Sequence, residues 1–122
     1  MITRAIATEN SSATILTRVL GADGNPVTRA DVSAVTVKVW DRDGAALINT
    51  HTPDVADAIY DTLQLDPRWT FDSTGYNLAI DIPGADLPDG DTTYRIEIKL
   101  TPTSGDGIYV IVDLKTENIL SE

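Results

Sequence analysis

Two consecutive segments of strict apolar and polar alternation limit the fold of this chain more than any other feature. From residue 94 to residue 100 every second side chain is apolar and the others are charged, a period of two that places the apolar side chains on one face of a strand. Residues 108–114 continue in the same way, after a connection with one proline and two glycines that suits a chain reversal. The pattern predicts a β-hairpin with Ile96 and Ile98 in the core.

The rest of the chain supplies further short strand candidates between turn-rich connections. Residues 53–65 fit both a helical stripe and an extended chain, and we predict a short turn of helix or coil followed by a strand at about 58–65. Residues 13–20 are partly apolar on both faces, which is typical of a central strand. The other candidates are residues 2–8, 33–40, 45–50 and 76–82.

Seven or eight short strands without a convincing long helix predict an all-β fold, an antiparallel β-sandwich. The length of 122 residues fits a single domain with its own core, so we expect residues 1–122 to form one unit. The tail, residues 115–122, is expected either to extend an edge strand or to fray.

The charge balance limits the partners of this chain. It has 19 acidic against 9 basic residues and a formal net charge of −10, which repels phosphate backbones and anionic lipid. We therefore expect no nucleic-acid and no membrane partner. The absence of cysteine excludes disulfides and thiol chemistry but leaves the compartment open. No apolar run is long enough for a signal peptide or a membrane span, so the sequence predicts a soluble protein without an export signal.

One stretch carries a resemblance to a known family. Residues 87–98 read Leu-Pro-Asp-Gly-Asp-Thr-Thr-Tyr-Arg-Ile-Glu-Ile, which resembles the corner that enters the penultimate strand of immunoglobulin-like and fibronectin type III domains. With Gly-Asn-Pro-Val at residues 24–27 before a valine-rich strand, the chain is similar to the immunoglobulin-like modules of bacterial cell-surface and bacteriophage virion proteins. It departs from antibody domains in lacking both cysteines, and the interval from Leu87 to Tyr94 is one residue longer than in fibronectin domains.

The resemblance implies a non-enzymatic structural or interaction module of a phage, prophage or surface assembly, which would make the protein virion-associated or surface-associated. The chemistry of the residues agrees with a non-enzyme. His51 is the only histidine, and we expect it to be a solvated loop residue. The serines lack a Gly-x-Ser-x-Gly pattern, so they do not indicate a nucleophile.

Calcium is the strongest alternative reading of the acidic turns, because several carboxylates can offer hard oxygens to one ion. The weak candidates are Asp41, Asp43, Asp89 and Asp91, with the pair at positions 23 and 25 as a further possibility. An EF-hand frame that starts at Asp41 fails, since its twelfth position is a threonine. We expect turn residues and no cofactor, and keep calcium as the alternative.

Carbohydrate binding is the other alternative, because exposed aromatic faces can stack on sugar rings. The candidates are Trp40, Trp69, Phe71 and Tyr76. The competing expectation is that Tyr76 and one tryptophan lie in the core, while Trp69 and Phe71 pin a long connection to the sandwich.

Two apolar residues of the second hairpin arm, Tyr109 and Ile111, fall on the face opposite the core. The matching face of the first arm is charged. A strand that is buried on one face only gives no reason for this placement, so we expect a cover. The cover is either the tail at residues 119–120 or another protein subunit, and these two residues are the predicted interaction site.

Overall fold

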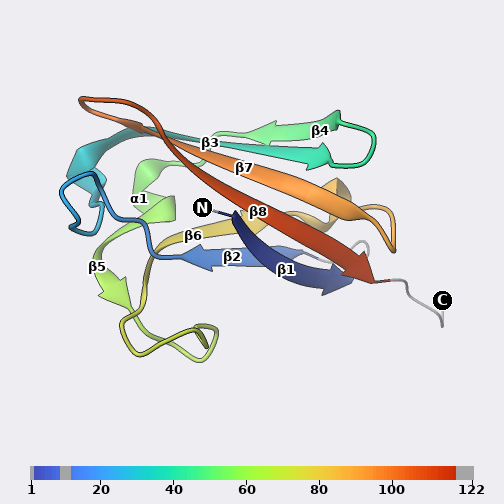
Figure 1. Ribbon diagram of the computed structural model, residues 1–122, viewed down its shortest axis with the longest axis horizontal. Helices are drawn as coiled ribbons and strands as arrows, with labels where there is room; N and C mark the ends of the chain where they lie inside the picture. Colours follow the sequence, from blue (N-terminus) through green and yellow to red (C-terminus); the bar gives the residue numbers. More distant parts are fainter. Residues whose placement is uncertain (1, 9–11, 118–122) are drawn as a thin grey trace.

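The structure is a computed structural model that describes residues 2–8 and 12–117, and it forms two packed layers of strands (Figure 1). The predicted all-β sandwich is confirmed, with eight strands in the described ranges. The strands are β1 (Ile2–Thr8), β2 (Ala13–Thr17), β3 (Val32–Asp41), β4 (Ala46–His51), β5 (Ile59–Gln64), β6 (Tyr76–Ile82), β7 (Thr93–Pro102) and β8 (Ile108–Glu117). Three short helices lie between them: η1 (Arg29–Asp31), α1 (Val55–Ala58) and η2 (Gly84–Asp86).

The strands form a five-stranded sheet in the order β1-β8-β7-β3-β4 and a three-stranded sheet in the order β2-β6-β5. All pairs are antiparallel except β1 and β8, which are parallel. The parallel pair was not part of the predicted antiparallel sandwich. Strand β1 pairs with the outer edge of β8 and extends the sheet by one strand. The alternating pattern of β8 does not indicate that this neighbour is present.

The predicted hairpin is the centre of the five-stranded sheet. Strand β7 pairs with β8 on one side and β3 on the other, so its inward side chains have neighbours on both sides. Ile96 and Ile98 are fully buried, as predicted. Ile98 lies opposite Val110 on β8 and Val37 on β3, both of them buried. The alternation therefore indicated the core face correctly.

The core between the layers consists mainly of branched aliphatic side chains, which suit a pleated, buried surface. Alternate residues of β3, β6, β7 and β8 supply most of it. The fully or almost fully buried members include Val35, Val37, Val39, Leu78, Ile80, Ile82, Ile96, Ile98, Leu100, Val110, Val112 and Leu114.

The three-stranded sheet is less regular than the five-stranded one. The expected helical turn and strand are present as α1 and β5, but β5 pairs with β6 only at Ile59 opposite Leu78 and Gln64 opposite Tyr76. In the part of the chain that the structure describes, residues 79–82 of β6 pair with β2 alone. Strand β2 is an edge strand, so the prediction of a central strand was wrong. Its outward Leu16 is only half-buried.

Strand β8 continues through Glu117, so residues 115–117 of the predicted tail extend a strand. Residues 118–122, which include the apolar pair expected to fold back, lie outside the described ranges. The helices of the described part have at most four residues, and none of them is long and apolar enough to cross a membrane.

Candidate functional site

The corner before β7 is closed by a buried tyrosine. Leu87 and Tyr94 are fully buried, and the hydroxyl of Tyr94 accepts a hydrogen bond from the backbone N–H of Asp89 at 3.0 Å. Burial raises the pKa of Tyr94, so the hydroxyl keeps its proton. From β8, the hydroxyl of the buried Thr116 donates to the carbonyl of Asp89 at 2.5 Å and accepts from the N–H of Thr92 at 3.2 Å. Two strands therefore fix this turn.

The four weak calcium candidates lie in two turns that are built from other interactions. Oδ1 of Asp41 accepts hydrogen bonds from the backbone N–H groups of Asp43 and Gly44 at 3.1 and 3.2 Å, which is the geometry of a turn closed by its own aspartate. Asp91 has a positive φ of 48° and lies 3.7 Å from the ammonium of Lys115. Within residues 2–8 and 12–117, no group of three or more acidic or histidine side chains is placed to hold a metal.

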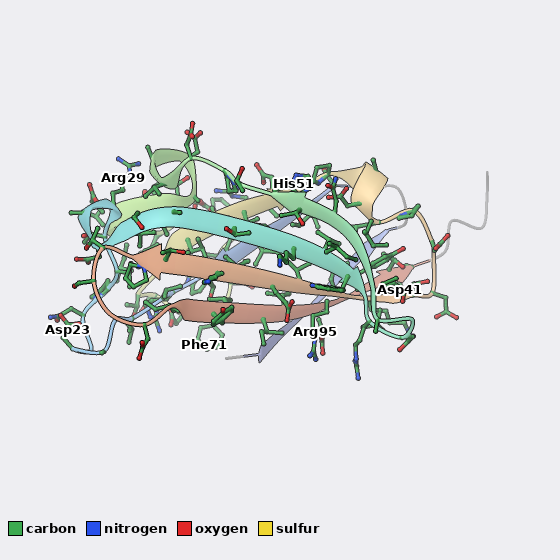
Figure 2. The ribbon with its side chains drawn as sticks, turned by 90° about the horizontal axis from the view of Figure 1, so that it is seen from above. Asp23, Arg29, Asp41, His51, Phe71 and Arg95 are labelled. Atoms are coloured by element: carbon green, nitrogen blue, oxygen red, sulfur yellow. The ribbon has the colours of Figure 1, made fainter. Side chains whose placement is uncertain are left out.

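The pair at positions 23 and 25 lies at the opposite end of the sandwich from Asp41 (Figure 2). Asp23 accepts from the backbone N–H and the side-chain amide of Asn25 at 3.0 and 3.2 Å. The backbone hydrogen bond in particular lowers the pKa of Asp23. This pair is therefore another closed turn, too far from the first candidates to share an ion with them.

The aromatic candidates do not form one platform. Trp40 lies on β3, in the other sheet from Tyr76 of β6, and its indole nitrogen is buried with no acceptor among the described residues. Trp69 and Phe71 belong to the β5–β6 connection and meet edge to face, with ring planes at 71°. Phe71 is 78% exposed. Trp69 and Phe71 therefore do not form a coplanar pair of rings on which a sugar ring could stack.

The connection from residue 65 to residue 75 is held by two aspartates. Asp66 accepts from the guanidinium of Arg68 at 3.0 Å and from the hydroxyl of Tyr76 at 2.5 Å, and these bonds hold its pKa well below the usual range, the guanidinium most strongly. Asp72 accepts from the indole N–H of Trp69 at 2.9 Å, the main cause of its lowered pKa, and pairs with Arg18 at 2.8 Å. Trp69 also packs against Tyr76 of β6, with ring centroids 5.7 Å apart, so it pins this connection to the sandwich as expected, while Phe71 projects outward.

His51 is not the solvated loop residue that the sequence suggested. It ends β4, is half-buried, and its Nε2 lies 2.5 Å from Oδ2 of Asp86 in η2. The other carboxylate oxygen of Asp86 accepts from the side-chain amide of Asn49 at 3.0 Å. Asp86 is almost fully buried. The prediction for His51 was wrong because Asp86 lies 35 residues away in the sequence, and its carboxylate holds the imidazole against η2.

The predicted interaction residues lie on the outer face of the five-stranded sheet. Tyr109 is 55% exposed, and the ammonium of Lys99 lies 5.8 Å from the centre of its ring. Ile111 is half-buried. Strand β1 begins beside Ile111 and runs away from Tyr109, so in the described ranges it flanks the isoleucine and leaves the tyrosine without a neighbouring strand on that side.

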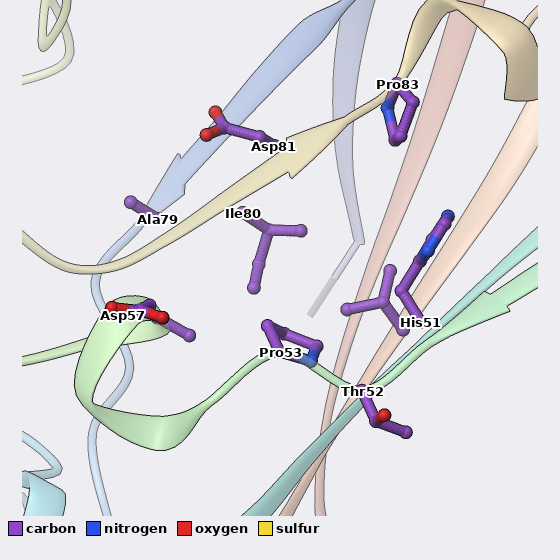
Figure 3. Close-up of a pocket in the computed structure, with 10 residues that line it drawn as sticks. His51, Thr52, Pro53, Asp57, Ala79, Ile80, Asp81 and Pro83 are labelled. Atoms are coloured by element: carbon purple, nitrogen blue, oxygen red, sulfur yellow. The ribbon is translucent and has the colours of Figure 1, made fainter.

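A cavity of about 390 Å³ opens between the end of β4 and the edge of β6 (Figure 3). Residues 51–53 form one wall and residues 79–81 form the opposite one. Val37 and Ala58, both buried, line it as well. Asp57 and Asp81 also line this cavity. No pattern in the sequence predicted this cavity, because it depends on how far β5 pairs with β6.

Sequence reasoning also missed the buried polar residues. Asn77, Asp86 and Thr116 are each at least 95% buried, and each joins segments that are far apart in the chain. The one available signal was Asn77, a polar residue directly before the apolar residues 78–80 of the same strand.

A scan of protein-family models finds none that matches this chain, and a search of curated proteins finds no match either.

Proposed function

We propose that this protein is a non-enzymatic, immunoglobulin-like interaction module of a larger assembly, such as a phage, prophage or cell-surface structure. The order of its strands supports the immunoglobulin-like part. Immunoglobulin domains place strands B, E and D in one sheet and G, F, C and, in the variable type, C′ in the other. The sheets β2-β6-β5 and β8-β7-β3-β4 follow these two orders.

The corner before β7 supports the same proposal. In immunoglobulin domains a tyrosine near the start of strand F bonds back to the backbone a few residues upstream, as Tyr94 does with Asp89. Ile96 stands two residues later, where antibody domains have a cysteine. A buried isoleucine therefore contributes by packing where antibody domains use a disulfide.

The observation that carries the interaction role is the outer face of β3, β7 and β8. This face presents four basic side chains against three acidic ones, on a chain whose net charge is −10. Neighbouring strands pair opposite charges across it, as Lys38 with Glu97 and Arg95 with Asp113; the second pair is in contact at 3.1 Å. The acidic excess of the protein therefore lies elsewhere.

A nearly neutral face with an exposed aromatic residue suits a second copy of this chain. Most soluble oligomers are symmetric, and a two-fold interface brings the same patch of both copies together. Such contact would be repulsive on the acidic surfaces but not on this face. Tyr109, half exposed beside Lys99, is the type of residue that serves as an interface anchor.

Light scattering after size exclusion tests the proposal with two double variants. Tyr109→Lys with Ile111→Lys places two charges on the face, and Ala30→Lys with Ala85→Lys places the same charges on exposed sites of η1 and η2. We expect an oligomer for the wild type and the control variant, and a folded monomer for the first variant. A wild type that remains monomeric as its concentration is raised, or dissociation in both variants, would contradict self-association through this face.

A further inference from the structure

The cavity beside β4 is a slot where the three-stranded sheet lacks a strand. Its walls are formed by runs of consecutive residues, 51–53 and 79–81. Side chains of consecutive strand residues point to opposite faces, so a wall made from three in a row is the backbone edge of β6. Ile80 and Pro53 face each other across the space (Figure 3).

Among the described residues, nothing pairs with the edge of β6 along this wall. Strand β5 begins at Ile59, which pairs with Leu78, and the four residues before it form α1 and not a strand beside residues 79–82. No loop in the described ranges makes a backbone hydrogen bond to residues 79–82. An exposed strand edge with free N–H and C=O groups is a template for an added strand.

The slot is preformed. At one end, His51 and Asn49 of β4 bind the buried carboxylate of Asp86, which holds the end of β4 against the η2 corner. At the other end α1 is closed by hydrogen bonds from the N–H groups of Asp57 and Ala58 to the carbonyl of Asp54, at 3.0 and 3.2 Å. A ligand would therefore not have to order these walls, which reduces the entropy lost on binding.

The lining of the slot indicates what it can hold. Val37, Ala58 and Ile80 are buried, apolar residues, and the volume of about 390 Å³ lies within the range of ligand sites, roughly 300–1,000 Å³. Asp57 and Asp81 are exposed carboxylates on the rim. Asp81 makes one exposed hydrogen bond, from the hydroxyl of Thr14 at 2.7 Å. The rim is thus negative on an already acidic protein.

We propose that this slot binds an extended segment of a partner protein, which pairs with the free edge of β6 and places an apolar side chain in the slot and a lysine or arginine against Asp57 and Asp81. Main-chain hydrogen bonds would supply affinity, and the pocket and its charged rim would supply specificity. The proposal extends the proposed interaction function to a second surface. It does not depend on self-association through the outer face.

A peptide library tests this proposal. The probe is a set of acetylated heptapeptides, Thr-Val-x-x-x-Val-Thr, with three randomised positions. We expect selection of sequences with lysine or arginine beside valine, isoleucine or leucine. A selected peptide should slow the amide hydrogen exchange of every second residue between 79 and 82, because only the alternate N–H groups that point away from β2 gain partners.

Matched variants identify the cause of the selection. Asp57→Asn with Asp81→Asn should weaken a lysine-containing peptide about 3- to 10-fold, as expected for exposed charge pairs. Asp43→Asn with Asp106→Asn changes the net charge equally at exposed sites outside the slot and should leave binding unchanged.

Three outcomes would overturn the proposal: no selection of basic residues, an equal loss in both pairs of variants, or protection from exchange away from residues 79–82. The Tyr109→Lys, Ile111→Lys variant should bind the peptide as the wild type does. Failure of the slot and failure of the outer face are therefore separate results.

Discussion

The side chain of Asn77 is expected to be among the most sensitive positions of the fold. It is 1% exposed. Its Oδ1 accepts from the N–H of Val19 at 2.7 Å, and its Nδ2 donates to the carbonyls of Val19 and Val27 at 3.0 and 2.8 Å. Asn77→Ala removes three hydrogen bonds and leaves the N–H of Val19 and the carbonyl of Val27 without a partner among the described residues, while the carbonyl of Val19 keeps the N–H of Val27 at 3.0 Å. At about 0.5–1.5 kcal/mol for each bond, with a desolvation cost for the unpaired groups, the loss should be about 3–5 kcal/mol.

Urea unfolding followed by circular dichroism measures this loss as a lower midpoint with an unchanged slope. Asn77→Asp should cost at least as much, because a carboxylate cannot donate to the two carbonyls and its charge would be buried. Thr14→Val is the control, since it removes one exposed hydrogen bond and should cost less than about 1 kcal/mol. A cost below about 1 kcal/mol for Asn77→Ala, or an Asn77→Asp variant as stable as the wild type, would refute this reasoning.

Three further predictions concern the core, calcium and acid. Ile98→Ala should cost about 2–5 kcal/mol in denaturant melts, because its buried neighbours on both sides cannot close the space, and Glu97→Ala less than about 0.5 kcal/mol; equal, small losses would contradict the assigned core face. Millimolar calcium should move the thermal midpoint no more than magnesium does, through charge screening alone, and a large shift specific to calcium would show that the acidic turns bind it. The lowered pKa values of Asp66 and Asp72 mean that the unfolded chain binds more protons than the folded one in acid. The two carboxylates therefore contribute fully to the free energy of unfolding above about pH 4, and this contribution is lost as the pH falls below that value. An Asp66→Asn, Asp72→Asn variant should lose less stability between about pH 5 and pH 2 than the wild type, and equal losses would contradict this.

The sequence predicted the strands in which one face is strictly apolar. Strand β7 is the clearest case, because Ile96 and Ile98 alternate with charges and a shift by one residue would bury those charges. The segment before β6 was also predicted correctly as a short helical turn followed by a strand. In each case the information is local, since it lies within a few residues of the element itself.

The features that the sequence did not reveal depend on partners far along the chain. Asn77 is buried because the backbone at Val19, 58 residues away, fits its amide. His51 is held by Asp86, which no pattern near the histidine predicts. The parallel pairing of β1 with β8 and the late start of β5 beside β6 are choices between strands of similar composition. The slot exists because β5 does not pair with residues 79–82 of β6, so the sequence did not predict the slot either.

The candidate site was predicted in part. The alternation correctly placed Tyr109 on the outer face of the sheet, where it is half exposed. It did not reveal that β3 lies beside β7 and adds Lys38 to the same face, because the order of the strands depends on partners far along the chain. The acidic turns were calcium candidates because of their composition. In the structure, Asp41 and Asp23 accept hydrogen bonds that close their own backbone turns.

The central claim is that two copies meet through the outer face of the five-stranded sheet, and the distance between spin labels in two copies tests it most directly. The chain has no cysteine, so Lys38→Cys places one label on this exposed face, and Thr62→Cys places one on β5 in the other sheet. If the claim is correct, double electron–electron resonance will give one short, narrow distance for the label at position 38 and a longer one for position 62. No coupling at position 38 in concentrated samples, or a shorter distance at position 62, would contradict it.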